Sequence, residues 1–409
     1  MNQTASAPQE IVIVGGGFTA ASAAGSLRSE GFEGAITIVG AEPHRPYERP
    51  PLSKGYLQGK DDVSKVFTHD DQWYADNRIA LELSNEAIAL DADKQTVWLA
   101  SGKTLSYDKL LLATGSAPRI LSIAGRGLNG VLYLRTLDDS NRLRTAFETA
   151  KSIAIIGGGW IGLEAAAAAR AAGLKVTVLE AGELPLLNVL GPEVAQVFAD
   201  LHRAHGVDLR TEVLVSEILG ENGHVTGVQL DDGIVEADLV LIGIGVTPNI
   251  KLAEAAGLDI HNGVLTQSGL RTSNEHIYAA GDVANAFHPF YNDHIRVEHW
   301  ANAKNQGELV AKSMLGQQVV YDRLPYFFTD QYELGMEYSG YVTAEGYDKV
   351  VLRGTTEEGI YFWLRNDQVI AGMCINIWDK IGVVQDLIRS RVHIDPDKLA
   401  DTAVDLPSA

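Results

Sequence analysis

A glycine-rich turn near the start of the chain has the residue types and spacing that hold a dinucleotide. Gly15, Gly17 and Ala20 form the pattern G-x-G-x-x-G/A directly after a β-branched run and before an Ala-rich one. The first glycine permits a tight turn, the second lets the backbone approach a pyrophosphate, and the small third residue lets helix and strand pack closely. We expect the pyrophosphate on the helix N-terminus, beside Phe18 and Thr19, where free N–H groups favour an anion.

A second turn repeats the pattern 142 residues later. Its glycines are Gly157, Gly159 and Gly162, and Trp160 and Ile161 stand within it as further candidate cofactor contacts. One such fingerprint is a weak indication, because glycine turns are common. Two in the same register, each inside a complete strand–helix–strand pattern, predict two dinucleotide sites.

Each unit also ends its second predicted strand in an acid. Glu42 stands 27 residues after Gly15 and is expected to accept hydrogen bonds from a ribose. Glu180 stands 23 residues after Gly157, where a carboxylate pairs with the 2′-OH of an adenosine ribose and repels a 2′-phosphate. The residues that follow, AGELP, include no arginine to hold such a phosphate. We therefore predict that NADH is preferred over NADPH.

The elements that position these residues indicate an α/β fold with two Rossmann-like dinucleotide-binding domains. Asn222-Gly223 and Asp232-Gly233 are hairpin signals that predict small antiparallel layers on the parallel-sheet core. From about Pro325, aromatic and β-branched residues alternate, and a helix is expected from about Asp379 to Arg389. This change predicts a separate α+β C-terminal domain.

Three further glycine-bearing segments fit two dinucleotide sites. LLLATGSAPR and LVLIGIGVTPN are buried strands that run into turns where we expect the chain to cross from one dinucleotide domain to the other and back. IYAAGDVA places a carboxylate after a strand and a glycine, where it can hold the ribityl hydroxyls of a flavin. Taken alone, each segment is equally compatible with an ordinary strand and turn. The candidate cofactor-binding residues in the three segments are Ala113, Thr114, Gly115, Gly245, Gly281 and Asp282.

The order of the segments resembles the ferredoxin-reductase family of two-dinucleotide-binding flavoproteins, the NADH-dependent reductases of the putidaredoxin reductase and biphenyl dioxygenase ferredoxin reductase type. The segments are GGGFTAASAA, RPYERPPLSKGYL, LLATGSAPR, IIGGGWIGLEAA, VTVLE, GIGVTPN, IYAAGDVA, VEHWANAKNQG and FFTDQYEL. The resemblance runs over nearly the whole chain and implies a glutathione-reductase-like fold that binds FAD and NAD. It implies an FAD-binding domain at 1–116 and 246–324, an NAD-binding domain at 117–245 and an α+β C-terminal domain at 325–409.

The resemblance also implies roles outside the glycine turns. Arg49 and Lys54 would line the flavin site, where the charge of Lys54 near flavin N5 would stabilise the negative reduced ring; the alternative is a rigid, cationic surface turn. Glu164, on the first helical turn, would pair with Lys54 and face the nicotinamide pocket, or be a first-turn acid that favours the helix dipole. Arg119 and Arg135 would neutralise phosphate or steer the ring, unless they are exposed salt-bridge partners.

VEHWANAKNQG would begin a helix whose N-terminus points toward the flavin pyrimidine edge. The residues implied there are Glu298, His299, Trp300 and Ala301, with Trp300 otherwise a core residue. One position departs from the family, which often has tryptophan where Phe328 stands. Phenylalanine keeps an apolar cover over the flavin but lacks the indole N–H.

The composition excludes several classes of function. A net charge of −20 argues against nucleic acid or an anionic membrane surface as a partner, and no apolar run approaches the roughly eighteen residues of a membrane helix. The polar first ten residues show no secretory signal, so we expect a cytoplasmic protein. The one cysteine, Cys374, rules out a redox dithiol or a four-thiolate cluster, and the eleven histidines show no ligand spacing, so we expect no metal.

We therefore predict an FAD-dependent NADH:ferredoxin oxidoreductase, a monomer or weak dimer. It would pass electrons from NADH via FAD, one at a time, to a [2Fe–2S] ferredoxin of a cytochrome P450 or ring-hydroxylating dioxygenase system. The lack of any cysteine before residue 374 excludes the dithiol reductases and the cysteine-dependent peroxidases of this superfamily. A rubredoxin reductase and a monodehydroascorbate reductase-like enzyme stay open. So does a different class, an apoptosis-inducing-factor-like FAD protein, which the acidic charge disfavours.

Overall fold

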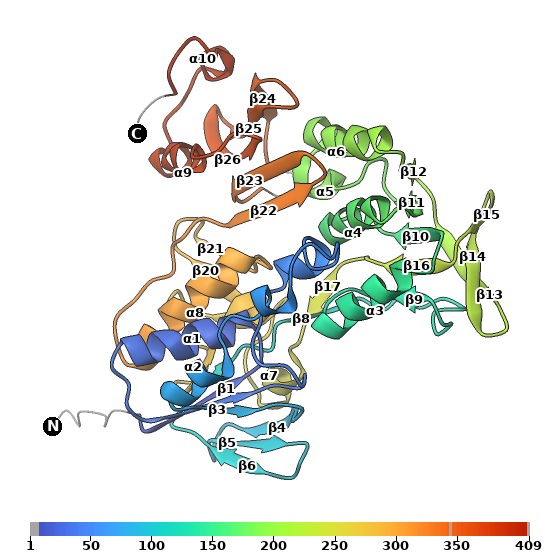
Figure 1. Cartoon of the computed structure of the whole chain (residues 1–409). Coiled ribbons are helices and arrows are strands. Elements are labelled where there is room, and N and C mark those ends of the chain that lie inside the picture. Colours follow the sequence, from blue (N-terminus) through green and yellow to red (C-terminus); the bar gives the residue numbers. More distant parts are fainter. Residues whose placement is uncertain (1–7, 343–345, 407–409) are drawn as a thin grey trace. The chain divides into compact units, whose positions relative to one another are not determined.

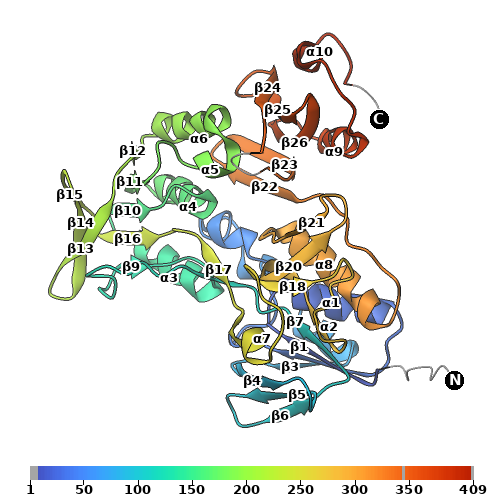
Figure 2. The same ribbon diagram turned by 180° about the vertical axis from the view of Figure 1, so that it is seen from behind.

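The computed structural model describes residues 8–342 and 346–406, which fall into two compact units built from discontinuous segments (Figures 1 and 2). The first unit contains the chain up to Arg49, Val63–Ala117 and Thr247–Arg323. The second contains Pro50–Asp62, Pro118–Val246 and the chain from Leu324 onward. Residues 1–7, which include most of the polar start considered above, lie outside the described residues.

A five-stranded parallel sheet forms the centre of the first unit. Its order is β3-β2-β1-β7-β19, which is the 3-2-1-4-5 order of a dinucleotide-binding sheet. The strands are apolar runs such as IVIV because both faces of the sheet are buried in apolar clusters. They are β1 (Glu10–Val14), β2 (Ala35–Val39), β3 (Ile79–Glu82), β7 (Lys109–Leu112) and β19 (Ile277–Ala279).

Two helices that are far apart in the sequence lie side by side in this unit (Figure 1). They are α1 (Phe18–Ser29) and α8 (Trp300–Met314). Gly307 allows the close approach, because a Cβ there would come within 2.7 Å of the Thr19 carbonyl oxygen. The Ser26 hydroxyl donates to the Glu308 carbonyl at 3.1 Å. The N-terminal helix is therefore held by a segment 282 residues away.

A small antiparallel sheet (β4-β5-β6), a small mixed sheet (β18-β20-β21) and short helices complete the first unit. Strands β5 and β6 pair as an antiparallel hairpin. The remaining elements are β4 (Ala87–Asp91), β5 (Thr96–Leu99), β6 (Thr104–Ser106), β18 (Val264–Thr266), β20 (Ala284–His288), β21 (Asp293–Ile295), α2 (Asp71–Asp76), α7 (Lys251–Ala255) and the 3-10 turns η2 (Val63–Lys65) and η3 (Gly281–Val283).

A second five-stranded parallel sheet, of order β12-β11-β10-β16-β9, forms the centre of the second unit. Helices α3 and α4 pack against the same face of this sheet, because Leu143 of α3 and Ala166 of α4 lie in one apolar cluster with Ile155 of β10. The elements are β9 (Val131–Leu132), β10 (Ser152–Ile156), β11 (Lys175–Leu179), β12 (Asp208–Arg210), β16 (Leu239–Ile242), α3 (Leu137–Phe147), α4 (Trp160–Ala171), α5 (Leu187–Leu190), α6 (Pro192–Ala204) and the 3-10 turn η1 (Pro50–Ser53).

The predicted hairpins of this unit are confirmed. Strands β13 (Val215–Glu221), β14 (His224–Leu230) and β15 (Gly233–Glu236) form an antiparallel sheet. Asn222 and Gly223 adopt positive φ angles of 52° and 81° at its first turn, as a tight hairpin requires.

The C-terminal part is α+β, as predicted. An antiparallel sheet of order β22-β23-β26-β25-β24 packs with α5 and α6 through a shared apolar core. The indole N–H of Trp363 donates to the Leu190 carbonyl at 2.9 Å. The elements are β22 (Tyr326–Gln331), β23 (Leu334–Gly340), β24 (Lys349–Gly354), β25 (Gly359–Arg365), β26 (Gln368–Ile375), α9 (Ile381–Ser390) and α10 (Pro396–Ala400).

Two connecting strands, β8 (Ser116–Pro118) and β17 (Val246–Pro248), pair where the compact units meet in the sequence. They fall in the segments where we expected the chain to cross. The compact units do not follow the predicted domains one to one, since Pro50–Asp62 belongs to the second unit. The predicted domain boundaries stay a prediction.

Candidate functional site

The first glycine turn connects β1 to α1 and is closed on one side. Gly15 has a φ of 124°, and a Cβ there would lie 2.0 Å from the Ala113 carbonyl oxygen at the end of β7. Only glycine fits this position. Ala20 is fully buried, so a larger residue would separate α1 from the sheet. The candidate residues Gly15, Ala20 and Ala113 thus pack the turn against the carboxyl ends of β1 and β7.

The other side of this turn is open. A Cβ on Gly17, the N-cap of α1, would meet nothing within 4 Å. The cap makes no side-chain hydrogen bond, and the first turn, which begins with Phe18 and Thr19, contains no acid. These features fit a pyrophosphate at the N-terminus of a twelve-residue helix.

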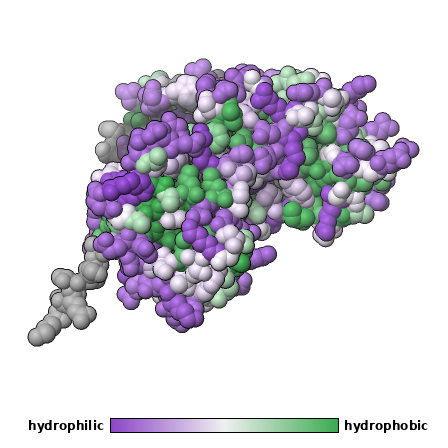
Figure 3. Space-filling view, turned by 60° about the horizontal axis from the view of Figure 1, so that its bottom comes forward, coloured by the Kyte–Doolittle hydropathy of each residue, from purple (hydrophilic) through white to green (hydrophobic). Residues whose placement is uncertain are grey.

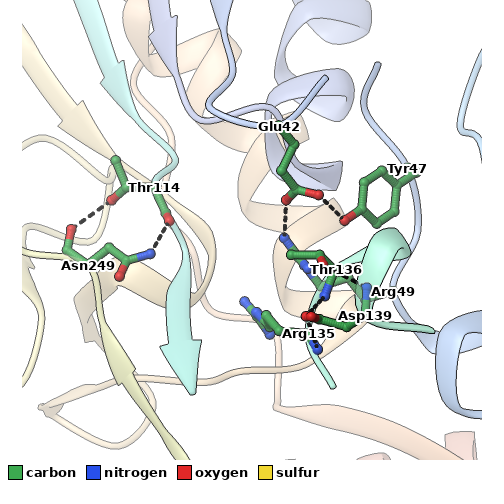
Figure 4. A network of polar contacts seen from close by, with 8 residues as sticks. All are labelled: Glu42, Tyr47, Arg49, Thr114, Arg135, Thr136, Asp139 and Asn249. Carbon is green, nitrogen blue, oxygen red and sulfur yellow. Dashed lines mark hydrogen bonds and ion pairs between the residues drawn. The ribbon is translucent and has the colours of Figure 1, made fainter. Parts of the chain in front are cut away.

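Glu42 lies three residues beyond β2 and is held by two donors (Figure 4). The Tyr47 hydroxyl donates to one carboxylate oxygen at 2.5 Å, and Arg49 lies 3.4 Å from the other. Arg49 therefore neutralises Glu42 in this structure. The carboxylate oxygens keep lone pairs for a ribose hydroxyl.

The Thr114 turn is locked to Asn249 by reciprocal hydrogen bonds (Figure 4). The Thr114 hydroxyl donates to the Asn249 carbonyl at 2.9 Å, and the Asn249 side-chain amide donates to the Thr114 carbonyl at 2.8 Å. The Asn249 backbone N–H donates to the carbonyl of Gly115, whose φ is 65°. The two connecting segments are therefore fixed to each other.

The turn after β19 packs against α1. A Cβ on Gly281 would lie 2.4 Å from the Thr19 hydroxyl, and the Gly281 N–H donates to Gln306 at 2.8 Å. Asp282 follows as the second residue of η3. Glu298 pairs with Arg296.

Helix α8 begins at Trp300, as predicted, with His299 as its N-cap and Ala301 as its second residue. The Trp300 ring stacks on Phe18 at a centroid distance of 5.3 Å and donates its indole N–H to Glu48 at 2.9 Å. Trp300 is thus not a plain core residue. Burial lowers the pKa of His299 to about 4, so its imidazole is neutral at pH 7.

The second glycine turn repeats the first in the second unit. Gly157 has a φ of 105°, and a Cβ there would lie 2.4 Å from the Gly243 carbonyl oxygen at the end of β16. A Cβ on Gly162 would lie 2.2 Å from the Gly157 carbonyl oxygen. Gly159, the N-cap of α4, faces open space and has no side-chain cap. This turn therefore also fits a pyrophosphate.

Glu180 follows β11 and accepts two backbone hydrogen bonds. Its carboxylate oxygens accept from the Gly158 N–H at 2.7 Å and from the Gly182 N–H at 2.8 Å. Trp160 packs edge-on against Phe198 of α6 and Phe327 of β22, whereas Ile161 is 45% exposed. The turn thus presents a fixed carboxylate and an exposed apolar side chain.

Glu164 collects three donors in a buried cluster of the second unit. Ser53 and Lys54 donate to its carboxylate, and the Thr329 hydroxyl donates at 2.5 Å. The expected Lys54–Glu164 ion pair is present, with side chains 16% and 6% exposed. The expectation that Glu164 lies on the first turn of its helix is wrong, because α4 begins at Trp160 and no acid stands in that turn.

Two further side chains of β22 lie near this pair. The Lys54 ammonium is 5.6 Å from the centroid of the Phe328 ring. Burial raises the pKa of Asp330, with Lys54 opposing and Glu164 adding to the shift. The Lys54 ammonium thus pairs with Glu164 and also attracts the Asp330 carboxylate.

Arg119 and Arg135 were implied as phosphate or ring contacts, and both make hydrogen bonds within the protein. The Arg119 guanidinium donates to the Val246 carbonyl at 3.2 Å. The backbone N–H of Arg119 donates to the carbonyl of Gly245, whose φ is 95°. The backbone N–H of Arg135 donates to the Asp139 carboxylate. Asp139 also forms the capping box of α3 with Thr136 (Figure 4). Their cofactor roles stay predictions.

Sequence reasoning missed four residues that complete these clusters: Ser53, Thr329, Glu48 and Asn249. All four lie inside segments that carried the resemblance. Their partners are up to 252 residues away, so no local spacing indicated the contacts.

Two dinucleotide turns, each at the carboxyl end of a parallel sheet, define a nucleotide-dependent oxidoreductase fold. The model of the pyridine nucleotide-disulphide oxidoreductase family matches residues 9–307, and that of the reductase C-terminal domain matches residues 326–409. The chain belongs to this family. The predicted family, fold class and class of FAD- and NAD-dependent reductase are confirmed.

The chain is similar to named reductases over nearly its whole length. It is 39% identical over 401 residues to the ferredoxin–NAD(+) reductase component of the anthranilate 1,2-dioxygenase system of Burkholderia cepacia, covering 97% of this chain and 98% of the relative. It is 37% identical over 402 residues to rhodocoxin reductase of Rhodococcus erythropolis, covering 98% and 94%. The crystal structure of the covalent putidaredoxin reductase–putidaredoxin complex matches with a TM-score of 0.94 and 36% identity, covering 98% of each chain.

No helix within residues 8–342 and 346–406 has the length and apolar character needed to cross a membrane. Hydrophilic side chains cover much of the face in Figure 3, with apolar patches between them.

Proposed function

We propose that this chain is an NADH:ferredoxin reductase that serves a [2Fe–2S] ferredoxin of a cytochrome P450 or ring-hydroxylating dioxygenase. The observation that carries the proposal is two complete dinucleotide turns in a chain whose one cysteine is inert. Cys374 is fully buried, and burial raises its thiol pKa to about 12. A buried thiol of this kind does not exchange disulfides. Electrons therefore leave for an external acceptor without a protein disulfide.

The residues of the first turn would hold FAD and those of the second would hold NADH. FAD, when bound, supplies the chemistry that converts a two-electron donor into a one-electron donor. Gly15, Gly17 and α1 bind the FAD pyrophosphate, and Glu180 selects the ribose of NADH. The positive charge of Lys54 would stabilise the negative reduced flavin, and Glu164 pairs with that ammonium.

The other predicted cofactor contacts belong to the same proposal. The stacked rings of Phe18 and Trp300 would form an apolar wall near the first turn, and Phe328 would contact the flavin. Ile161 is the apolar contact for the nicotinamide. We further infer a monomer or weak dimer located in the cytoplasm.

The acceptor protein has to dock on an acidic reductase. Three cations of the loop from Arg45 to Lys54 are already paired: Arg45 with Asp71, Arg49 with Glu42, and Lys54 with Glu164. Trp378, 55% exposed, and the exposed Lys380 lie just before α9. We therefore place the docking surface on the C-terminal domain and expect an apolar as well as an electrostatic contribution.

A visible spectrum of the purified protein, titrated anaerobically with NADH, tests the proposal. We expect a flavin spectrum that bleaches with NADH, and cytochrome c reduction that appears only when a [2Fe–2S] ferredoxin is added. Equal turnover with rubredoxin or with monodehydroascorbate and no ferredoxin would support those alternatives instead. Sluggish bleaching would favour the apoptosis-inducing-factor-like class. A protein that stays colourless after reconstitution with FAD contradicts the proposal.

A further inference from the structure

A chain of buried polar side chains leads away from the Lys54–Glu164 pair within the second unit. It runs from Glu164 on α4 to Thr329 and Gln331 on β22 and ends at His202 on α6. These four side chains are 6%, 1%, 1% and 0% exposed, respectively. Thr329 and Gln331 are two residues apart on a strand, so they point to the same face. Buried polar groups are costly unless they are satisfied, so this chain requires an explanation.

Each side chain in this series is within hydrogen-bond distance of the next. The His202 Nε2 lies 2.8 Å from the Gln331 Oε1, and the Gln331 Nε2 donates to the Thr329 hydroxyl oxygen at 3.3 Å. The Thr329 hydroxyl donates to the Glu164 carboxylate at 2.5 Å. Lys54 donates to the same carboxylate oxygen. His202 is therefore connected to Lys54 through three intervening side chains.

The chemistry of the groups fixes the direction of every bond. An ionised carboxylate only accepts, so the Thr329 hydroxyl has to donate to Glu164, and its lone pair receives the Gln331 amide. The Gln331 carbonyl then faces His202, which has to carry its proton on Nε2. The His202 Nδ1 is left as an acceptor, and the Tyr332 hydroxyl lies 3.4 Å from it.

Burial is consistent with this single neutral tautomer. It lowers the pKa of His202 to about 4, with Gln331 opposing and His205 adding to the shift. Tyr332 stacks on His205 at 3.7 Å between ring centroids, and His205 lies 3.0 Å from the exposed Glu333. His205 on α6 and Tyr332 and Glu333 on the turn after β22 are thus titratable groups near His202. At pH 7, His202 therefore donates one hydrogen bond in a fixed direction.

We propose that His202 and Gln331 are positioning residues of the reductase, which orient the Thr329 hydroxyl so that it holds Glu164 against Lys54. The inference deepens the proposed function, because it assumes that Lys54 lies beside the flavin. Ser53 supplies the other neutral donor to the carboxylate. When one of these hydrogen bonds is removed, the Glu164 carboxylate accepts fewer neutral hydrogen bonds and attracts the Lys54 ammonium more strongly. The reduced, negative flavin then loses stabilisation by positive charge.

The first measurement tests the chain without using turnover. In protein labelled with ¹⁵N-histidine, NMR should show a His202 signal of the Nε2–H tautomer, assigned by its loss in His202→Gln. Thr329→Val should shift this signal, and Thr329→Ser, which keeps the hydroxyl, should restore it. Thr266→Val is the matched control, because Thr266 is a buried threonine in the first unit. An unchanged His202 signal in Thr329→Val, or an equal shift in the control, overturns the proposal.

The second measurement is the midpoint potential of bound FAD. Thr329→Val and Gln331→Met should each move it to more negative values, with Thr329→Ser close to wild type. The double variant should match the larger single shift, since both changes break one chain, whereas independent packing defects would add. Gln331→Met takes the place of Thr329→Val in the NMR experiment if the valine variant does not fold.

Lys54→Met separates this inference from the proposed function. If Lys54→Met changes the midpoint potential but Thr329→Val and Gln331→Met do not, the positioning role is wrong and the proposed function stands. If Lys54→Met also has no effect, the placement of Lys54 beside the flavin is wrong, and the inference falls with it.

Discussion

Replacement of Glu180 by alanine should reduce the preference for NADH over NADPH. The carboxylate is held at the end of β11 by two backbone N–H groups, at 2.7 and 2.8 Å. Because these two hydrogen bonds hold the carboxylate, we expect it to face the group at the 2′ position of the ribose. Alanine removes both the acceptor for a 2′-OH and the charge that repels a 2′-phosphate.

The magnitude follows from these two effects. A hydrogen bond from a hydroxyl to a charged acceptor contributes about 1.5–3 kcal/mol, so KM for NADH should rise by about tenfold or more. Two like charges about 4 Å apart repel by about 4 kcal/mol at an effective dielectric of about 20. Glu180 is only partly buried, so solvent screening reduces this to about 1 kcal/mol. Together these effects amount to about 2.5–4 kcal/mol, so the NADH/NADPH ratio of kcat/KM should fall by about 60-fold or more.

The assay is kcat/KM for each nucleotide with ferricyanide as acceptor, together with the melting temperature of each variant. Glu180→Gln keeps an acceptor oxygen without the charge, so it should fall between wild type and alanine. Glu183→Ala makes the same chemical change at an exposed acid three residues away and should leave the ratio unchanged. A ratio within twofold of wild type in a well-folded Glu180→Ala protein would show that the ribose is recognised elsewhere.

Three further changes have defined outcomes. Gly15→Ala should prevent folding or FAD retention because its Cβ would clash with backbone, whereas Gly17→Ala, whose Cβ meets nothing, should fold normally and bind FAD more weakly; thermal melts and bound-flavin content distinguish the two. Burial lowers the pKa of His202 and of His299 to about 4 from 6.5, so the unfolded chain binds more protons than the folded chain between these values. The free energy of unfolding should therefore fall as pH decreases from about 6.5 to about 4, by about 1.4 kcal/mol per pH unit for each histidine, and His202→Gln should remove one of the two contributions in urea titrations. The ferredoxin-dependent rate should fall as salt is raised, and a flat salt profile would leave only apolar docking through residues such as Trp378.

Much of the fold follows from local patterns in the sequence. Each strand–turn–helix unit is encoded within about thirty residues, as is usual for this motif. The helices beginning at Phe18 and Trp160 and the hairpin at Asn222-Gly223 were accordingly predictable. Residues 325–409 were also predictable as α+β, because their alternation has the period of a strand.

The candidate site was less predictable because its contacts are distant in the sequence. The Lys54–Glu164 pair spans 110 residues and was expected only from the resemblance. The Thr329 hydroxyl, 165 residues from Glu164, gave no local signal. The position of Glu164 was misjudged, because it is the fifth residue of α4. With Gly159 as N-cap, the acid falls beyond the first turn.

The packing of α1 against α8 sets the order of events during synthesis. The sheet beside α1 lacks β19 until Ile277–Ala279 have been made, and α8 follows later still. A nascent polypeptide several hundred residues long thus emerges from the ribosome with the small-residue face of its first helix uncovered. We therefore expect FAD to bind to the first unit only late in translation or after the polypeptide is released. Prematurely terminated products should accordingly be substrates for chaperones and proteases rather than partly active enzymes.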